Sequence, residues 1–233
     1  MTRGMENRLT CPIDGVLHLL DRQVVDSDGK FLGKVDDVEL TERDGELLIT
    51  GVLTGPAALL DRFGGKVGRL LVERWGQMRV SEPDRTTPWR IDIDAVERLD
   101  SAVHLRVPRD GILRRDRERR RLGRLTGMDV YGPDGSRLGR VIDARFEPES
   151  AAGGESGIPH LILCSLLVGH GRPGSMLGYD RRSDQGPWLV RVAVRWLHRH
   201  TAIVGAEDAD IDWDGAKVRL GVRPTERPSH PFR

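Results

Sequence analysis

The chain has 233 residues, with 37 Lys and Arg against 36 Asp and Glu, so its net charge is +1. This balance excludes a protein that is built globally to bind nucleic acid or an anionic membrane. Hydrophobic residues make up 38% and charged residues 31% of the chain, which is typical of a soluble protein with small cores. The 28 Gly and 13 Pro favour many turns and short strands over long helices.

Three features bear on the cellular location. The two cysteines, Cys11 and Cys164, are far apart and in no metal-ligand spacing, as in a reduced intracellular protein. The longest apolar run, residues 158–168, is too short to span a bilayer and is interrupted by Pro159 and His160. The N-terminus has no apolar signal-peptide core. We therefore expect a cytoplasmic protein that does not insert into a membrane.

The first predicted element is a hairpin in "VVDSDGKFLGKV", residues 24–35. Asp28–Gly29 between two apolar, partly alternating runs predicts a type I′ turn, since Asp and Gly tolerate positive φ. Gly33 stands inside the second strand, where glycine costs stability, so we expect a bulge or sharp bend there. Neither face of residues 31–40 is wholly apolar, which also indicates a bent strand.

A second Asp-Gly, Asp44–Gly45, leads into the predicted strand "ELLITGVL". The following segment "KVGRLLVERW", residues 66–75, has apolar residues at helical spacing. It is interpreted either as a short helix that closes a barrel end or as an apolar ridge that binds a partner, because Trp and Arg are common interface anchors. The candidate partner-binding residues in this region are Phe63, Val67, Leu70, Leu71 and Trp75. The strands "WRIDI" and "AVHLRV" follow.

Residues 109–124, "RDGILRRDRERRRLGR", hold eight Arg and three acidic residues. A solvated linker is one interpretation, and binding of RNA, DNA or an acidic partner through phosphate or carboxylate contacts is the other. The segment lacks the interleaved aromatic residues that would stack on bases. The candidate contacts are Arg114, Arg115, Arg117, Arg119, Arg120 and Arg121.

The second half of the chain repeats the first. A shift of 106 positions aligns Asp28, Gly29 and Gly33 with Asp134, Gly135 and Gly139. "LLITGVLTG" then aligns with "LILCSLLVG", and "IDIDAV" with "VAVRWL", so that "TAIVG" is predicted as the last strand of the second copy. The middle of this copy is a Gly-rich loop, with Met176, Leu177 and Tyr179 as possible partner contacts. A spacing of about 100 residues fits two tandem small domains rather than a solenoid.

The acidic stretch "DIDWDG", residues 210–215, matches the start of an EF-hand loop. An EF-hand needs a Glu at its twelfth position, where this chain has Gly221. We therefore expect a hairpin with arms "ADIDW" and "AKVRLGV". No nucleotide-binding, hydrolase or zinc motif occurs, and the sequence predicts no catalytic residue, metal or cofactor.

The two segments "VVDSDGKFLGKVDDVEL" and "DVYGPDGSRLGRVIDARF", each followed by an apolar strand and a closing segment that contains Trp, resemble the PRC-barrel family. That family includes the barrels of the photosynthetic reaction centre H subunit and of the bacterial ribosome maturation factor. The resemblance covers residues 17–107 and 126–205. It implies a small β-barrel and a docking role, and it brings no shared catalytic residues.

The sequence therefore predicts a mainly β fold, with two tandem small PRC-like β-barrels, short helices and an Arg-rich linker. The expected divisions are a tail at 1–15, barrel one at 16–108, the linker at 109–125, barrel two at 126–222 and a tail at 223–233. We expect a non-enzymatic docking or scaffold protein that binds protein partners, with self-association left open. The alternatives are RNA or ribosome binding through the linker, and a ligand site or active site between the barrels.

Overall fold

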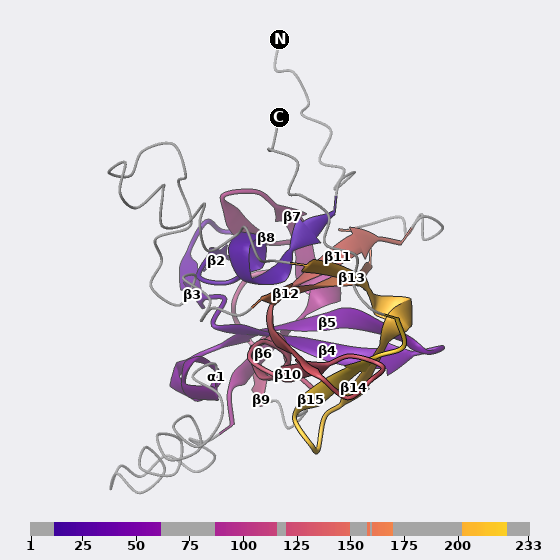
Figure 1. Cartoon of the computed structure of the whole chain (residues 1–233). Helices are drawn as coiled ribbons and strands as arrows, with labels where there is room; N and C mark the ends of the chain where they lie inside the picture. Colours follow the sequence, from indigo (N-terminus) through magenta and orange to yellow (C-terminus); the bar gives the residue numbers. More distant parts are fainter. Residues whose placement is uncertain are drawn as a thin grey trace, which may run out of the picture. The chain divides into compact units, whose positions relative to one another are not determined.

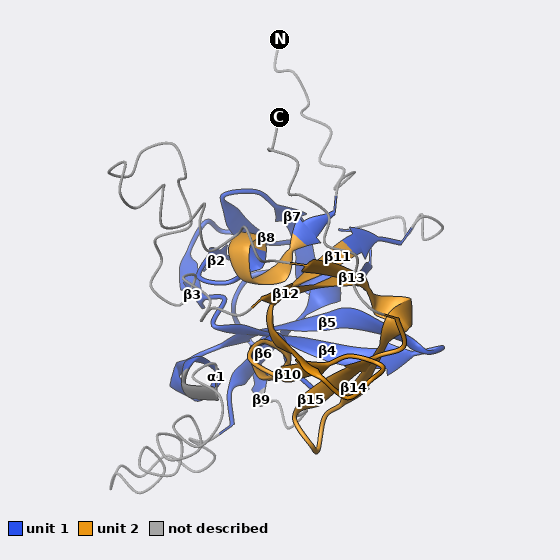
Figure 2. Ribbon diagram, viewed as in Figure 1, with its two compact units in different colours: residues 1–13, 19–123, 147–162 blue, residues 14–18, 124–146, 163–233 orange. Residues whose placement is uncertain are grey.

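The computed structural model describes residues 12–61, 87–115, 120–149, 158, 160–169 and 202–222. These residues form mainly β-strands joined by short helical turns (Figure 1), which confirms the mainly β fold. Within them, no helix is both long and apolar enough to cross a membrane. The chain divides into two compact units (Figure 2). Unit 1 holds residues 1–13, 19–123 and 147–162, and unit 2 holds residues 14–18, 124–146 and 163–233.

A four-stranded sheet forms one part of unit 1. Its strand order is β3 (Phe31–Lys34), β2 (Gln23–Val25), β8 (Ala102–Leu105) and β7 (Val96–Leu99). β2 is antiparallel to β3 and parallel to β8, and β8 is antiparallel to β7. Val24 and Val103 are register partners and both are buried, so their row faces the core. The residues next to them along each strand therefore face away from the core.

The remaining strands of unit 1 are arranged around β5 (Glu46–Thr54). β5 is antiparallel to β4 (Asp37–Arg43) and to β6 (Trp89–Asp92), and the short β9 (Arg114–Arg115) extends the sheet beside β6. Leu40, Ile49, Leu53 and Ile91 fill the core between these strands. α1 (Pro56–Asp61) follows β5, and the 3₁₀ turn η2 (Ile93–Ala95) joins β6 to β7. Because β3 and β4 belong to different sheets, the predicted bend in residues 31–40 is confirmed.

Unit 2 builds the same arrangement mainly from the second half of the chain, although the last two residues of β11 and the first two of β12 belong to unit 1. β10 (Asp129–Tyr131) is antiparallel to β11 (Arg137–Pro148) and parallel to β15 (Lys217–Leu220). β15 is antiparallel to β14 (Ala209–Asp212), which confirms the hairpin predicted around Asp214–Gly215. β12 (Leu161–Gly169) pairs with β13 (Ala202–Gly205), and the 3₁₀ turn η5 (Ala206–Asp208) joins β13 to β14. The order β11-β10-β15-β14 therefore matches β3-β2-β8-β7.

This match corrects the predicted end of the second copy. β13 pairs with β12 as β6 pairs with β5, so "TAIVG" corresponds to β6 and is not the closing strand. The closing strand is β15, which runs parallel to β10 as β8 runs parallel to β2. Residues 91–96 thus correspond to residues 204–209, and the predicted alignment of "IDIDAV" with "VAVRWL" is wrong. The short motif Val-X-Leu at the end of β8 and β15 is the signal that the sequence alignment missed.

The two repeated Asp-Gly turns also differ from the predicted type I′ geometry. Gly29 and Gly135 have φ of +77° and +76°, but the preceding Asp residues do not have positive φ. The Gly29 amide donates to the Asp26 carbonyl at 3.0 Å, and the Asp26 amide donates to the Lys30 carbonyl at 3.0 Å. This is a three-residue loop in which a type I turn ends on a left-handed glycine. The extra residue before Asp-Gly, Ser27 or Pro133, lengthens the loop and removes the need for positive φ at Asp.

The glycines inside the hairpin strands do mark the predicted bulges. Val24 is paired with Gly33 and Val25 with Phe31, so Leu32 is the extra residue, and Leu138 is the extra residue beside Gly139. A Cβ on Gly139 would lie 2.6 Å from the backbone oxygen of Gly169, and Gly139 has φ of +147°. A Cβ on Gly33 would lie 2.7 Å from Thr54 Oγ1. Both positions therefore need glycine for close approach as well as for the bend.

Candidate functional site

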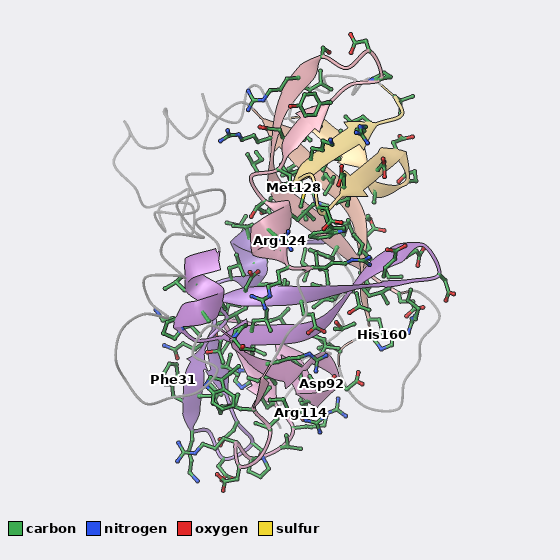
Figure 3. All side chains as sticks on the ribbon, turned by 90° about the horizontal axis from the view of Figure 1, so that it is seen from below. Phe31, Asp92, Arg114, Arg124, Met128 and His160 are labelled. Carbon is green, nitrogen blue, oxygen red and sulfur yellow. The ribbon has the colours of Figure 1, made fainter. Side chains whose placement is uncertain are left out.

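The outward face of the four-stranded sheet in unit 1 is the candidate functional site. The register places Phe31, Val25, His104 and Arg98 in one row across β3, β2, β8 and β7. Phe31, labelled in Figure 3, is 56% exposed and is the most exposed large hydrophobic side chain of the described residues. The neighbouring row holds Lys34, Gln23 and Ala102. We call these seven residues the neutral face.

Charge on the neutral face is low. His104 Nε2 lies 3.1 Å from Asp100 Oδ1, and Arg98 pairs with the same carboxylate, so the arginine charge is compensated locally. Burial, and after it the charge of Arg98, lowers the pKa of His104, although Glu97 opposes the shift. The imidazole is therefore neutral at pH 7. Lys34 is the remaining cation of the face, and an exposed aromatic ring stands among neutral neighbours.

The corresponding face of unit 2 has the opposite character. Asp129 takes the place of Gln23, and its Oδ1 accepts bonds from Arg137 at 2.6 Å and from Arg140 at 3.0 Å. Burial works to raise the pKa of Asp129, but the two guanidinium groups outweigh it and hold the pKa below its usual value. On the neighbouring strands Lys217 lies 3.5 Å from Asp212 and Arg219 lies 3.8 Å from Asp210. We call this surface the charged face.

A buried polar network lies elsewhere in unit 1. Arg90 donates from Nε to Glu39 at 2.7 Å and from Nη2 to the Thr50 carbonyl at 2.9 Å, and Thr50 Oγ1 donates to Glu39 at 2.5 Å. A Cβ on Gly51 would lie 2.8 Å from Arg90 Nε, so Gly51 leaves room for the guanidinium against β5. Burial works to lower the pKa of Arg90, but its bonds to Glu39 and Asp92 raise it. A permanently charged Arg cannot exchange protons, so this network stabilises the fold rather than serving as an acid–base pair.

Unit 1 also contains a small apolar cavity. It lies among core side chains that include Val35, Val38, Val52, Val96 and Val103. A cavity of this kind has room for about one water molecule and offers no polar partner, so it is not a ligand site. In the part of the chain that the structure describes, no three or more His, Cys, Asp and Glu side chains are arranged to hold a metal ion.

None of the eight predicted partner-binding residues lies in the part of the chain that the structure describes. Phe63, Val67, Leu70, Leu71 and Trp75 of the first copy, and Met176, Leu177 and Tyr179 of the second, lie outside the described residues. The turn and bend residues Asp28, Gly29, Gly33, Asp134, Gly135 and Gly139 all lie in the two hairpins.

The arginines of the predicted linker have separate environments. Arg114 is exposed, and the backbone of Arg115 pairs with Trp89 in β6. Arg120 pairs with Glu42 at 2.8 Å, and Arg121 is 8% exposed. Arg117 and Arg119 lie outside the described residues.

The sequence did not identify the neutral face. Phe31, Val25 and His104 lie on three strands that come together only in the folded unit, so no local spacing connects them. One signal was available, since Phe31 stands where the second copy has Arg137. An aromatic residue directly after a polar turn, replaced by Arg in an otherwise close repeat, marks a position that the fold leaves open to solvent. No family model matches the chain, and no curated protein sequence matches it.

Proposed function

We propose that the chain is a non-enzymatic docking protein that binds protein partners, another copy of itself included, through the neutral face of unit 1. Phe31 is the central anchor, Val25 and Ala102 add apolar area, and Lys34 and Arg98 stand at the rim. Phe31 carries the proposal because its side chain is 56% exposed although its backbone is paired within the sheet. Burying a Phe side chain fully is worth about 1.5–3 kcal/mol, which is typical of an interface anchor.

The contrast with unit 2 supports this choice of face. A partner that covers the charged face must remove water from the ion pairs of Asp129, Lys217 and Arg219, which costs more than those exposed pairs return. Covering the neutral face removes water from Phe31, Val25 and Ala102, and at the rim from Lys34 and from a single ion pair, between Arg98 and Asp100. Because His104 is neutral at pH 7, its desolvation adds no ionic cost. The neutral face is therefore the better docking surface of the two.

The resemblance to the PRC-barrel family points to the same class of function, since barrels of that family act as docking modules. An RNA-binding role for the Arg-rich segment has less support. Arg120 is engaged by Glu42 and Arg121 is buried, so of the candidate arginines whose side chains are described only Arg114 extends into solvent without either restriction. Binding of a nucleic acid backbone needs several free cations along one surface.

The test compares three tagged forms of the full chain as baits in an extract of the source cell. These are the unsubstituted protein, Phe31→Arg and Arg137→Ala, where position 137 corresponds to position 31. We expect the same partner with the unsubstituted protein and with Arg137→Ala, and at least tenfold less of it with Phe31→Arg. Sedimentation velocity of the three forms tests self-association with the same expected order. Equal recovery with all three baits, together with equal sedimentation, would contradict the proposal.

A further inference from the structure

Each unit contains a short segment that precedes the repeat of the other unit. Residues 14–18, which include the first four residues of the π-helical turn η1 (Gly15–Leu19), precede the first hairpin but belong to unit 2 (Figure 2). Residues 120–123, at the start of α3 (Leu122–Leu125), precede the second hairpin but belong to unit 1. We call residues 14–18 lead-in one and residues 120–123 lead-in two. The shift of 106 that aligns the repeats also aligns these segments.

One carboxylate at an equivalent position holds each lead-in. In unit 2, Asp143 accepts from the amides of Val16 at 2.8 Å and Leu17 at 3.3 Å, and from its own neighbour Ala144 at 2.7 Å. In unit 1, Asp37 accepts from the amides of Gly123 at 2.8 Å and of its own neighbour Val38 at 2.8 Å. The shift of 106 relates Asp37 to Asp143 and Leu17 to Gly123. Both carboxylates satisfy amide groups at the start of a helical turn, which have no partner within the turn.

The chain returns to its own repeat immediately after each lead-in. The Asp21 amide donates to the Val35 carbonyl at 2.7 Å, and the Gly127 amide donates to the Val141 carbonyl at 2.7 Å. These bonds are again related by the shift of 106. The crossover therefore takes only the three residues between positions 17 and 21, and the equivalent three between 123 and 127. The exchange of lead-ins is a feature of both repeats, not an accident of one.

Each lead-in has a charge opposite to that of the strand it binds, and the signs are reversed between the two units. In unit 2 the lead-in supplies an acid, and Asp14 pairs with Arg145 of β11 at 2.7 Å. In unit 1 the lead-in supplies a base, and Arg120 pairs with Glu42 of β4 at 2.8 Å, next to the backbone bridge between Arg121 and Glu39. Position 14 corresponds to 120, and position 145 to 39. The acidic lead-in therefore meets a basic strand, and the basic lead-in meets an acidic strand.

We infer that each lead-in is a specific, charge-matched ligand of the other half of the chain, so that residues 1–115 and 120–233 form an interlocked pair and neither half completes its own unit. A lead-in bound to its own half would bring Asp14 to Glu39 and Glu42, or Arg120 to Arg145. Like charges at these short distances disfavour that arrangement. The opposite charges of the two lead-ins, which we call the charge code, thus favour binding of each lead-in to the other half of the chain over binding to its own half.

The first test uses the full chain with a protease recognition sequence in place of residues 116–119. The folded protein is cleaved under native conditions and passed through a size-exclusion column. We expect the two fragments to elute together at the volume of the uncleaved protein and to separate only in denaturant. Elution as two separate, folded fragments would show that the halves are independent domains and would overturn the inference.

The second test assigns the association to the lead-ins. In the cleaved protein, Asp14→Arg should weaken the association of the fragments at least tenfold, and Arg145→Asp added to it should restore most of the loss. Asp14→Asn gives a milder loss and serves if Asp14→Arg does not fold. Asp210→Arg, which breaks an exposed ion pair of unit 2 away from the lead-in, is the control and should leave association unchanged. No loss with Asp14→Arg or Asp14→Asn, or no recovery in the double variant, would contradict the charge code.

Discussion

The sets β3-β2-β8-β7 in unit 1 and β11-β10-β15-β14 in unit 2 have the same strand order, and register partners occupy matching positions. Their inward residues are nearly the same, since Val24 and Val103 of unit 1 correspond to Val130 and Val218 of unit 2, and all four are buried. Their outward residues are different in kind. Phe31, Gln23 and His104 in one unit correspond to Arg137, Asp129 and Arg219 in the other.

This difference separates two kinds of constraint on the chain. The inward side, the bulge glycines and the lead-in carboxylates are required to fold each repeat, and they agree between the units. The outward side is not required for folding, so it can carry a neutral face in one unit and a charged face in the other. Substitutions on the two sides of the repeats test where this boundary lies.

The bulge glycines should be necessary in both units but to unequal degrees. We expect Gly139→Ala to lower the free energy of unfolding by about 3–5 kcal/mol, because the new Cβ meets a backbone oxygen and the φ of +147° disfavours any side chain. Gly33→Ala should cost only about 1 kcal/mol, since the Thr54 hydroxyl can rotate away. Urea denaturation of both variants measures the difference. Equal costs would show that the bend, and not the close approach, sets the requirement.

The lead-in site of unit 2 should make stability depend on pH. Burial raises the pKa of Asp143 to about 7, although the amides of Val16 and Ala144 oppose the shift. The folded chain therefore keeps a proton that the unfolded chain releases near its ordinary value of 3.8, so the free energy of unfolding falls as pH rises between these values. We expect a fall of about 4 kcal/mol from this group.

Asp143→Asn is the matched variant for this pH dependence. It keeps an acceptor oxygen for the amides of Val16 and Ala144 but places an NH2 group opposite the Leu17 amide, so its stability should be lower at every pH. Because the amide does not titrate, the fall with pH should largely disappear. Asp14, Arg145, His18 and Cys164 lie in the same region of unit 2, and comparing the two proteins at each pH cancels their contributions. A variant with the same pH profile as the unsubstituted protein would contradict the assignment to Asp143.

The first hairpin turn binds the chain near Arg109, directly after the first repeat, and the second hairpin turn has no equivalent side chain. Asp26 accepts from the amides of Lys30 at 2.8 Å, Asp28 at 3.0 Å and Arg109 at 3.2 Å, whereas the second repeat has Gly132 at this position. In Asp26→Gly we expect these three amides to exchange hydrogen about tenfold faster. Asp134→Ala in the second turn is the control, and it should leave exchange at residues 28, 30 and 109 unchanged.

The neutral face should tolerate substitution without loss of stability. We expect Phe31→Arg, which copies the residue of the second repeat, to change the free energy of unfolding by no more than about 0.5 kcal/mol. Thermal or urea denaturation measures this. A cost well above 1 kcal/mol would show that Phe31 contributes to the core of unit 1 rather than to a docking surface.

Much of the scaffold could be predicted from the sequence because its signals are local. Asp-Gly pairs marked the hairpins, mid-strand glycines marked the bulges, and the shift of 106 marked the repeat. The sequence also contains the signal for the type I turn of the first hairpin, because Asp26 at the first turn position and Gly29 at the fourth are the residues that this turn prefers. The pair Asp28–Gly29, taken alone, suggested a shorter turn. The sequence alignment misplaced the closing strand of the second copy because η2 and η5 share little sequence. The two turns nevertheless lead into equivalent hairpins, β7–β8 and β14–β15.

The lead-in exchange and the neutral face could not be predicted, because both depend on contacts between distant positions. Asp143 accepts a hydrogen bond from the amide of Val16, which is far away in the sequence. The residues around Asp143 do not distinguish it from a solvated Asp on an exposed strand. Similarly, Val25 and His104 become neighbours only through the parallel pairing of β2 with β8. Residue chemistry gives the kind of group available, and the topology decides what it faces.

Site-specific photo-cross-linking at positions 31 and 137 compares docking by the two faces, because the two positions are equivalent in the repeats and both are exposed. A photoreactive phenylalanine analogue is placed at one position at a time in the full chain, which is then irradiated in an extract of the source cell. We expect a discrete adduct with a protein partner, or with a second copy of the chain, from position 31 and none from position 137. An adduct from position 137 alone would contradict the assignment of docking to the neutral face.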